Sequence, residues 1–237
     1  MDSKRPLNMS EPVELRSSQF FDFSHFAHFQ LFEGDPFPWE VLKKLEKYLQ
    51  TLPLGNIEGQ VSNQAYLVHP HLISIGPGSI VEPGAYIQGP CWIGSGSTIR
   101  HGAYIRGNVL IGQGCVAGHD TEMKNAILLD GAHAAHFAYV GDSILGNKVN
   151  LGAGVKCANL KLDGEEVILS FKHQQIKTGL RKLGSMIGDG SQIGCNSVLN
   201  PGVLIGKQVK CYPCLNVGGF IPSGSTVKPL SGFKVVG

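Results

Sequence analysis

The sequence predicts an all-β fold: a parallel β-helix of short stacked coils, with a helical cap at its N-terminal end and one inserted hairpin. Three observations predict it. The 237 residues include 32 Gly and 13 Pro, so turns are unusually frequent. Hydrophobic residues nevertheless make up 42% of the chain, which is enough to form a core. Finally, aliphatic residues recur every six positions, as expected for a stack of short equivalent units.

The six-residue period is clear over the first half of the repeat region. Ile, Val, Leu or Met stands at nine of these ten positions: Ile75, Val81, Ile87, Ile93, Ile99, Ile105, Ile111, Ala117, Met123 and Leu129. A mostly small residue follows four places later, and Gly or Asn commonly stands between. Each unit therefore predicts a strand of about four residues and a corner that tolerates positive φ. Three units close a triangle of 18 residues, so we expect Ile75, Ile93, Ile111 and Leu129 to stack about 4.8 Å apart.

The repeat is interrupted in two places. The spacing shortens to five between Val140 and Leu145, and the pattern is lost over residues 158–185 before it returns from Ile187 to Val217. We therefore expect an N-terminal extension over 1–62, a β-helix over 63–228 with an insertion at 158–185, and a tail over 229–237. The period itself does not determine the hand of the helix.

The N-terminal extension contains one predicted helix. Asp35-Pro-Phe-Pro opens it, and Leu42, Leu45, Leu49 and Leu52 follow the 3-4-3 spacing of one apolar face. We expect this helix to cap the open end of the prism, which would otherwise expose strand edges. An aromatic cluster precedes it: Phe20, Phe21, Phe23, Phe26, Phe29 and Phe32. Packing against the helix or a neighbouring subunit is the expected role of this cluster, and ligand binding is the alternative.

Composition excludes several functional classes. The net charge is only +2, so no nucleic-acid partner is expected. No apolar run approaches the 18 residues of a membrane span, and the first residues do not resemble a secretory signal, so we expect a cytoplasmic protein. The six cysteines are then expected as reduced thiols. Cys211 and Cys214 have the C-x-x-C spacing without a second pair, which favours core thiols over zinc or redox chemistry.

The insertion carries much of the positive charge. Its first half predicts a hairpin that turns at Asp163-Gly164. A basic run follows: Lys172, Lys177, Arg181 and Lys182. Such an arm beside a solenoid would suit a phosphate group, although an ordinary solvated hairpin would look the same.

The histidines offer two different interpretations. His101 and His119 are 18 residues apart, so we expect them to stack on successive coils, where they could share a metal as in the gamma-class carbonic anhydrases. They lack that family's third histidine spacing, and no metal is expected. His133 and His136 lie where the six-residue register breaks. A register break beside ionisable side chains is a favourable place for a site.

The residues around this break resemble a known family. The run from His136 through Tyr139 to Asp142, then Asn150 and Asn159, is similar to the acetyltransferase half of bifunctional glucosamine-1-phosphate acetyltransferase/N-acetylglucosamine-1-phosphate uridylyltransferases. It is also similar to archaeal sugar-1-phosphate nucleotidylyltransferases with a C-terminal acetyltransferase domain. The resemblance covers about residues 70–228, and its motif residues match in order and without gaps from Arg106 to Asn159. It implies a left-handed parallel β-helix and a homotrimer whose site lies between subunits.

The resemblance also implies roles for individual residues. His136 stands at the position of the general base, which must take a proton from a sugar amine as the amine attacks the thioester of acetyl-CoA. Arg106 and Lys124 stand where the family holds the sugar phosphate with fixed positive charge. Tyr139, Asn150 and Asn159 stand at the positions that contact the sugar. The residues that bind acetyl-CoA are not identified.

The sequence departs from this family in two respects. No G-x-G-T-R segment precedes the predicted helix, so nucleotidyl transfer is not expected. Glu165 and Glu166 stand where relatives often carry lysine, which leaves the acceptor open. The leading hypothesis is an acetyltransferase acting on the amine of a sugar phosphate, such as glucosamine-1-phosphate, in UDP-N-acetylglucosamine biosynthesis. The alternatives are a non-catalytic subunit that binds a sugar nucleotide or serves a separate nucleotidyltransferase, and a metal-dependent hydratase.

Overall fold

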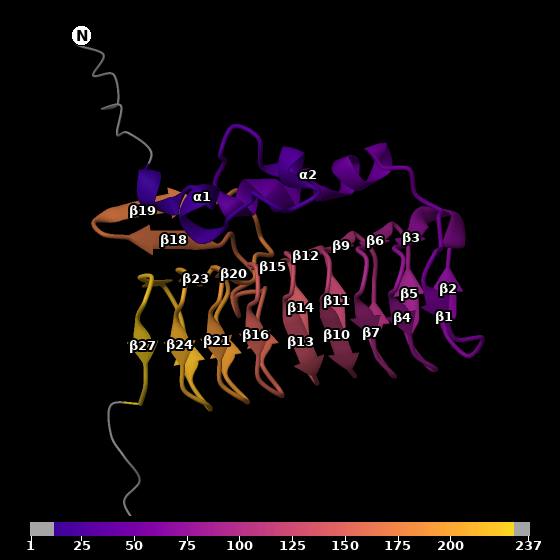
Figure 1. Cartoon of the computed structure of the whole chain (residues 1–237). Coiled ribbons are helices and arrows are strands. Elements are labelled where there is room, and N and C mark those ends of the chain that lie inside the picture. The colour runs from indigo at the N-terminus through magenta and orange to yellow at the C-terminus, as the bar shows by residue number, and fades with distance from the viewer. Residues whose placement is uncertain (1–11, 230–237) are drawn as a thin grey trace, which may run out of the picture.

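The protein, described here from a computed structural model over residues 12–229, is a three-sided prism of parallel strands (Figure 1). Each coil contributes one strand to each of three sheets, which we call the first, second and third faces. The first face contains β1 Gln60–Val61, β4 Ile80–Val81, β7 Thr98–Ile99, β10 Val116–His119, β13 His133–His136, β16 Asn150–Leu151, β21 Gln192–Ile193, β24 Lys210–Cys211 and β27 Thr226–Val227.

The other two faces have the same order along the axis. The second face contains β2 Tyr66–Val68, β5 Tyr86–Gln88, β8 Tyr104–Ile105, β11 Glu122–Lys124, β14 Tyr139–Gly141, β17 Lys156–Cys157, β22 Val198–Leu199 and β25 Asn216–Val217. The third face contains β3 Ile73–Ile75, β6 Cys91–Ile93, β9 Val109–Ile111, β12 Ala126–Leu128, β15 Ile144–Leu145, β20 Met186–Ile187, β23 Leu204–Ile205 and β26 Phe220–Ile221. The predicted left-handed parallel β-helix is confirmed.

The six-residue pattern is confirmed along most of the interior, but one residue of the predicted stack is wrong. Ile75, Ile93 and Ile111 pair in register on the third face, but the next residue of this stack is Leu128 and not the predicted Leu129. The corner before β12 is one residue shorter than the regular six-residue corners, with Asn125 at φ 44° joining two strands directly. The repeat therefore shortens to five at this corner and at the one predicted between Val140 and Leu145, and to four between Val217 and Ile221, where β25 passes into β26.

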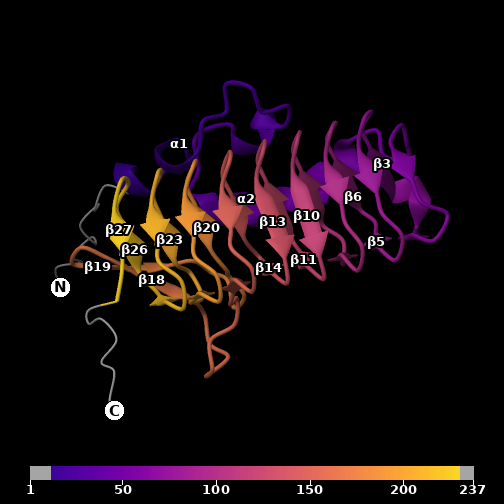
Figure 2. The ribbon, with the colours of Figure 1, turned by 60° about the horizontal axis from the view of Figure 1, so that its bottom comes forward.

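The predicted helix exists as α2 (Pro38–Thr51), but its predicted place as an end cap is wrong. α2 lies lengthwise along the third face (Figures 1 and 2). The physical reason is that the middle residue of several third-face strands is apolar and points outward. Leu110, Ile127 and Ile144 are fully buried in a second hydrophobic cluster with Leu42 and Leu45 of the helix. Covering this apolar face buries far more surface than closing one coil would.

The N-terminal aromatic cluster completes this cover. Short helices, η1 (Val13–Leu15), α1 (Ser17–Phe20) and η2 (Phe29–Phe32), precede α2, and a further one, η3 (Pro70–Leu72), precedes β3. Phe20, Phe21, Phe26 and Phe32 are buried among these segments and the third face, as the packing interpretation expected. Phe20 also meets Phe220 of β26 edge to face, with ring centroids 6.5 Å apart.

The insertion lies between Cys157 and Met186 and forms a hairpin, but its predicted turn is wrong. The paired strands are β18 (Ile168–Phe171) and β19 (Gln174–Lys177), which turn at Lys172-His173. Asp163-Gly164 forms a separate turn outside the paired strands. The hairpin has one apolar side, because alternate residues of β18 face the prism. Leu169 and Phe171 are buried against the end of the third face.

Within residues 12–229 no helix has the length and hydropathy needed to cross a bilayer. The predicted tail 229–237 lies outside the described residues except for its first position.

Candidate functional site

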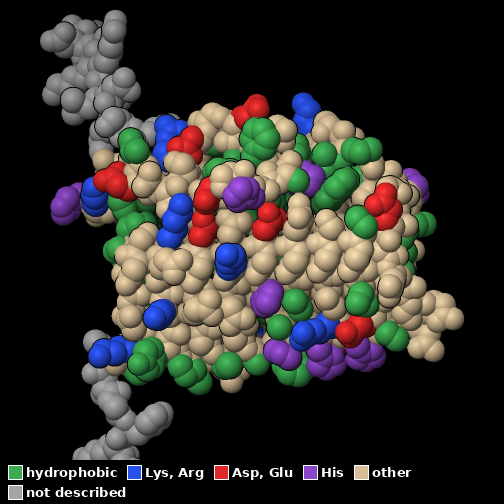
Figure 3. All heavy atoms as spheres, in the orientation of Figure 1, with side chains coloured by type: hydrophobic (Ala, Val, Ile, Leu, Met, Phe, Trp, Pro, Cys, Tyr) green, Lys and Arg blue, Asp and Glu red, His purple; other side chains and the backbone are tan. Residues whose placement is uncertain are grey.

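A row of histidines follows the edge where the first face turns into the second. His101 and His119 stack as predicted, with ring centroids 5.7 Å apart and planes 16° apart. His136 ends β13 directly opposite His119 of β10 and extends the row by one coil. Phe137 packs edge-on against His119 at 5.2 Å. Figure 3 shows histidine and hydrophobic side chains gathered along this lower edge of the prism.

The side chain of His136 is exposed and has no hydrogen-bond partner among the described residues. Its backbone is fixed on both sides, since β13 pairs with β10 and the His136 carbonyl accepts the N–H of Gly154 at 3.0 Å. Nearby, Nζ of Lys156 donates to the carbonyl oxygen of Phe137 at 2.7 Å. The imidazole therefore stands on a rigid strand end with both ring nitrogens available to a ligand.

Arg106 and Tyr139 lie close together on the second face. Nη1 of Arg106 donates to Oε1 of Glu122 at 2.6 Å, and this hydrogen bond raises the pKa of the guanidinium. Glu122 is the register partner of Tyr139 on the next strand. Burial raises the pKa of the Tyr139 phenol, and the charge of Asp142 adds to the effect, so the hydroxyl stays protonated at neutral pH.

Asp142 organises the edge between the second and third faces. Its carboxylate is 5% exposed and accepts hydrogen bonds from Nδ2 of Asn125 at 2.9 Å, from Nζ of Lys124 at 3.3 Å and from Nδ2 of Asn159. A buried carboxylate needs such partners to stay charged. The result is that Lys124 and Asn159, which belong to different coils, are held against a common anchor.

Gly141 allows Tyr139 and Asn159 to converge. A Cβ atom at Gly141 would lie 2.5 Å from the Tyr139 hydroxyl and 2.8 Å from Nδ2 of Asn159. Such contacts are shorter than side chains tolerate, so any larger residue would push the phenol and the amide apart. The glycine of the Tyr-Val-Gly-Asp run is therefore a packing requirement of the site.

A hollow of about 400 Å³ opens beside Lys124. Its wall is formed by Asn108, Lys124, Asn125, Asp142, Leu180 and Lys182, together with Leu42, Lys43 and Glu46 of α2. Three lysines thus face one space, and two carboxylates only partly balance them. Asn108 belongs to this wall, and its Oδ1 is buried without a hydrogen-bond partner in residues 12–229.

The structure brings the predicted residues together in two groups rather than one. Arg106, Lys124, Tyr139 and Asn159 share the second face and its edge with the third. His136 lies on the opposite edge of the second face, and Asn150 pairs with His133 on the first face, one coil beyond His136. No contact joins His136 to the lysine side within the described part of a single chain.

The basic run of the insertion does not form a single arm. Lys172 pairs with Glu14, and Arg181 donates through Nε to the carbonyl of Gly164 at 2.8 Å. Lys182 is the member that reaches the hollow beside Lys124. Glu166 accepts the N–H of Gly179 at 2.6 Å, so this carboxylate links the residues before β18 to those after β19. Glu165 stays exposed.

Sequence reasoning missed three contributors to this region. Asp142 was part of the quoted run but had no assigned role, although an acidic residue flanked by Lys and Asn on successive coils is the available signal. Glu122 lies 16 residues after Arg106, close enough to one coil to predict their contact. Lys43 could not be found from sequence, because its helix was expected at the end of the prism.

The cysteines and the histidine row do not assemble a metal site. The described residues contain no group of three or more His, Cys, Asp or Glu side chains suited to hold an ion. All six cysteines are free. Cys211 is a buried core thiol as predicted, but Cys214 is exposed, so the prediction of a core thiol is wrong for Cys214. The pKa of the Cys211 thiol is raised by burial, which makes it a poor nucleophile.

Comparison with known proteins supports the resemblance. The family described as GMPPB C-terminal domain matches residues 87–180. The chain is 33% identical over 180 residues to a bifunctional sugar-1-phosphate nucleotidylyltransferase/acetyltransferase of Sulfurisphaera tokodaii, covering 74% of this chain and 43% of that protein. It is 43% identical over 177 residues to the bifunctional protein GlmU of Methanococcus maripaludis strain C7, covering 72% and 41%. The chain thus spans about two fifths of the length of these relatives.

Among solved structures, a UDP-N-acetylglucosamine acyltransferase of Francisella novicida superposes with a TM-score of 0.50 at 13% identity, covering 73% of this chain and 66% of that one. This likeness concerns the fold. Together with the sequence relatives, it shows that the chain is related to the acetyltransferase region of the bifunctional sugar-1-phosphate nucleotidylyltransferase/acetyltransferases and has the left-handed β-helix fold of the hexapeptide-repeat acyltransferases.

Proposed function

We infer that this chain transfers an acetyl group from acetyl-CoA to the amine of a sugar phosphate, with glucosamine-1-phosphate as the first acceptor to test. The observation that carries the proposal is the placement of an exposed, unpartnered histidine on a rigid strand end beside a face that carries Arg106, Lys124 and Tyr139. These are the side chains that the chemistry needs: a base, fixed cations and hydroxyl-binding groups.

In the proposed reaction, the acceptor nitrogen attacks the thioester carbonyl carbon, a C–N bond forms and the C–S bond breaks. Nε2 or Nδ1 of His136 takes the proton that the nitrogen must lose, and the thiolate of coenzyme A leaves and is protonated in turn. A positioned base of this kind contributes roughly two to four orders of magnitude to the rate. An imidazole suits the role because it is largely neutral near pH 7.

The phosphate is proposed to bind in the hollow beside Lys124. Lys124, Lys43 and Lys182 supply positive charge from three different segments, and the unpartnered Oδ1 of Asn108 can accept a sugar hydroxyl. Lys124 keeps 23% exposure beside its 3.3 Å contact with Asp142, so its ammonium group can also reach a phosphate in the hollow. Tyr139 and Asn159 then lie on the sugar side of the hollow.

The proposed active unit is a homotrimer. Within one chain, His136 and Lys124 lie at opposite edges of the second face, so a sugar phosphate would need a second copy to complete its site. Apolar side chains exposed on these coils are available for such packing: Tyr66, Ile80, Tyr104, Phe137 and Val198. The separate turn of the insertion at residues 161–164, which we call its tip, adds Leu162, which is fully exposed. Site sharing between copies would bring the two groups of residues together.

The acceptor is best identified by measuring thiol release from acetyl-CoA across amino-sugar phosphates and nucleotide-linked amino sugars. The proposal expects release that depends on an acceptor carrying both an amine and a phosphate, with N-acetylated product confirmed by mass. Glucosamine without phosphate is the matched comparison and should react far more slowly. Binding of sugar phosphates without any thiol release would instead favour the non-catalytic subunit.

A further inference from the structure

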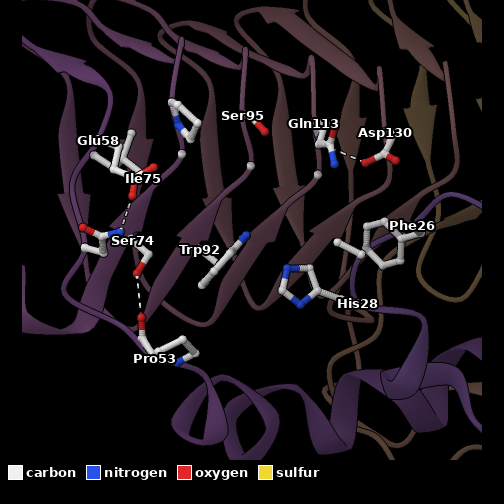
Figure 4. Close-up of a pocket in the computed structure, with 16 residues that line it drawn as sticks. Phe26, His28, Pro53, Glu58, Ser74, Ile75, Trp92, Ser95, Gln113 and Asp130 are labelled. Atoms are coloured by element: carbon white, nitrogen blue, oxygen red, sulfur yellow. Dashed lines mark hydrogen bonds between the residues drawn. The ribbon is translucent and has the colours of Figure 1, made fainter.

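A second pocket lies at the edge between the third and first faces, at the opposite edge of the first face from His136. It has a volume of about 340 Å³. Its walls come from three segments: the loop around Phe26 and His28, the connection from Pro53 to Glu58, and the corners of successive coils of the prism (Figure 4). None of the residues proposed for acyl transfer lines it.

The pocket is elongated along the axis of the prism. Glu58, Gly76, Gly94 and Gly112 follow the inward residues of four successive coils, and Asp130 lies at the corner of the fifth. With about 4.8 Å between coils, Glu58 and Asp130 stand on levels about 19 Å apart. Figure 4 shows these two carboxylates at opposite ends, with the Trp92 side chain between them.

Charge in this pocket is negative and uncompensated. Asp130 accepts the backbone N–H of Gln113 at 2.8 Å, and Glu58 accepts from Nδ2 of Asn56 at 2.6 Å. Both partners are neutral, and no Lys or Arg of residues 12–229 lines the space. Two carboxylates at the ends of an apolar, aromatic channel favour a cation and disfavour phosphates or nucleotides.

His28 supplies an independent sign of a ligand. It is 5% exposed, and its Nδ1 lies 3.0 Å from the hydroxyl of Tyr48 on α2. Its Nε2 is buried and has no partner in the described part of the chain. In Figure 4 this second nitrogen is directed toward Trp92 and the pocket, and the two rings meet edge to face at 5.0 Å. A buried polar atom left without a partner is destabilising unless something binds it.

From these observations we propose that the pocket binds a long, linear aliphatic polyamine. Its terminal ammonium groups pair with Glu58 and Asp130. Its methylene chain lies over the indole of Trp92, where an inner ammonium group adds cation–π attraction to the apolar contact. His28 takes the tautomer in which Nδ1–H donates to the Tyr48 oxygen, so that Nε2 accepts an N–H from an inner ammonium group. Length, charge and the orphan acceptor thus select the same ligand class.

The test is calorimetric titration of the full chain with spermine, spermidine, putrescine and an uncharged diol of similar length. We expect one saturable site per chain for spermine, affinity falling as the amine shortens, weakening with salt, and no binding of the diol. Glu58→Gln and Trp92→Leu should each weaken spermine binding by roughly tenfold or more. Asp163→Asn, which removes an exposed carboxylate from the insertion, is the matched control and should leave binding unchanged.

Glu58 is exposed, so its variant keeps the fold and makes the test decisive even if the Trp92 variant is unstable. Equal binding to the unchanged chain and the Glu58 variant, or equal loss in the Asp163 variant, would mean that the amine binds nonspecifically to surface charge. Absence of any saturable heat with spermine would also overturn the proposal. Thiol release is measured separately, because failure of this pocket leaves the proposal for His136 untouched.

Discussion

Nζ of Lys124 lies 3.3 Å from Oδ2 of Asp142, and this one carboxylate also holds Asn125 and Asn159. The side chain of Asp142 is nearly buried, whereas that of Lys124 keeps 23% exposure toward the hollow. Asp142 therefore serves the packing of the edge, while the ammonium group of Lys124 remains accessible from the hollow. In the proposed function, the carboxylate positions the cation that meets the phosphate.

Replacing Asp142 with Ala should have two separable effects. Three donors lose their acceptor, so the free energy of unfolding should fall by about 1–3 kcal/mol. Because Lys124 and Asn159 lose their common anchor, the KM for the sugar phosphate should also rise, by roughly tenfold or more. Thermal unfolding and steady-state thiol release measure the two. Lys124→Ala is the comparison: it should raise KM with a smaller loss of stability. An Asp142 variant with unchanged stability and KM would contradict the role of the carboxylate.

Replacing Ile127 with Ala tests how α2 packs. Ile127 points outward from the third face, yet it is fully buried beneath the N-terminal segments. The lost contacts should lower the free energy of unfolding by about 2–4 kcal/mol, as for a core residue. Ile168→Ala, at a side chain 45% exposed, should change it by less than about 0.5 kcal/mol. Chemical denaturation of both variants measures this, and equal, small effects would show that α2 does not cover this face.

Much of the fold is predictable because a period of six with 18-residue coils specifies a three-sided stack of parallel strands, whereas the hand of the helix came from the family resemblance. Sequence reasoning misplaced the residues at which the local structure departs from the six-residue period. Asn125 shortens a corner by one residue, so Leu128 points into the interior of the prism. Leu129 is buried instead in the second hydrophobic cluster, outside the prism. The place of α2 follows from the outward residues Leu110 and Ile144, whose apolar character is indistinguishable from core residues in sequence. Interactions between distant segments, such as Lys43 with the Lys124 hollow, leave no periodic signal.

The histidine row and the motif residues were accessible from sequence for the same reason. His101 and His119 are one coil apart, so their stacking follows from the period. The sequence identified the candidate site residues but not their distances from one another. The structure shows that they divide between two edges of the second face. Asp142 acts through buried hydrogen bonds to residues of other coils, and the sequence motif does not reveal these bonds.

Replacing Leu162 with Asp tests the proposed trimer. Leu162 is fully exposed at a turn of the insertion, where an isolated chain gains nothing from an apolar side chain. If this tip packs on a neighbouring copy, an added charge there should raise the dissociation constant of the assembly roughly tenfold or more, with an unchanged melting temperature of the monomer. Sedimentation velocity across a concentration series measures it. Lys161→Asp controls for charge alone; equal effects of the two variants would argue against apolar packing of the tip.

His28 makes stability depend on pH in a defined window. Burial lowers its pKa from 6.5 to about 4 in the folded protein. The surrounding groups are Tyr48, Trp92 and Phe26, with Glu58 and Asp130 across the pocket. Between pH 6.5 and 4 the unfolded chain binds the proton and the folded chain does not. Stability should therefore fall as the pH is lowered through this window, by roughly 2–3 kcal/mol in all, and be unaffected above it.

The difference between the unchanged chain and a His28→Phe variant isolates this effect, because other groups titrate equally in both. Denaturation at a series of pH values should show the unfolding free energy of the unchanged chain falling relative to that of the variant as the pH falls from 6.5 to 4. Parallel curves over that range would mean that His28 is accessible to protons in the folded state.

The central claim, that His136 is the base of an acyl transfer, is tested most directly by thiol release from acetyl-CoA with the best acceptor, compared between His136→Ala and His101→Ala. Both remove an exposed imidazole from the same edge, two coils apart. The account predicts that His136→Ala keeps its melting temperature and assembly but loses roughly two to four orders of magnitude in kcat, while His101→Ala keeps full turnover. Full activity of the His136 variant, or an equal loss in both, would contradict it.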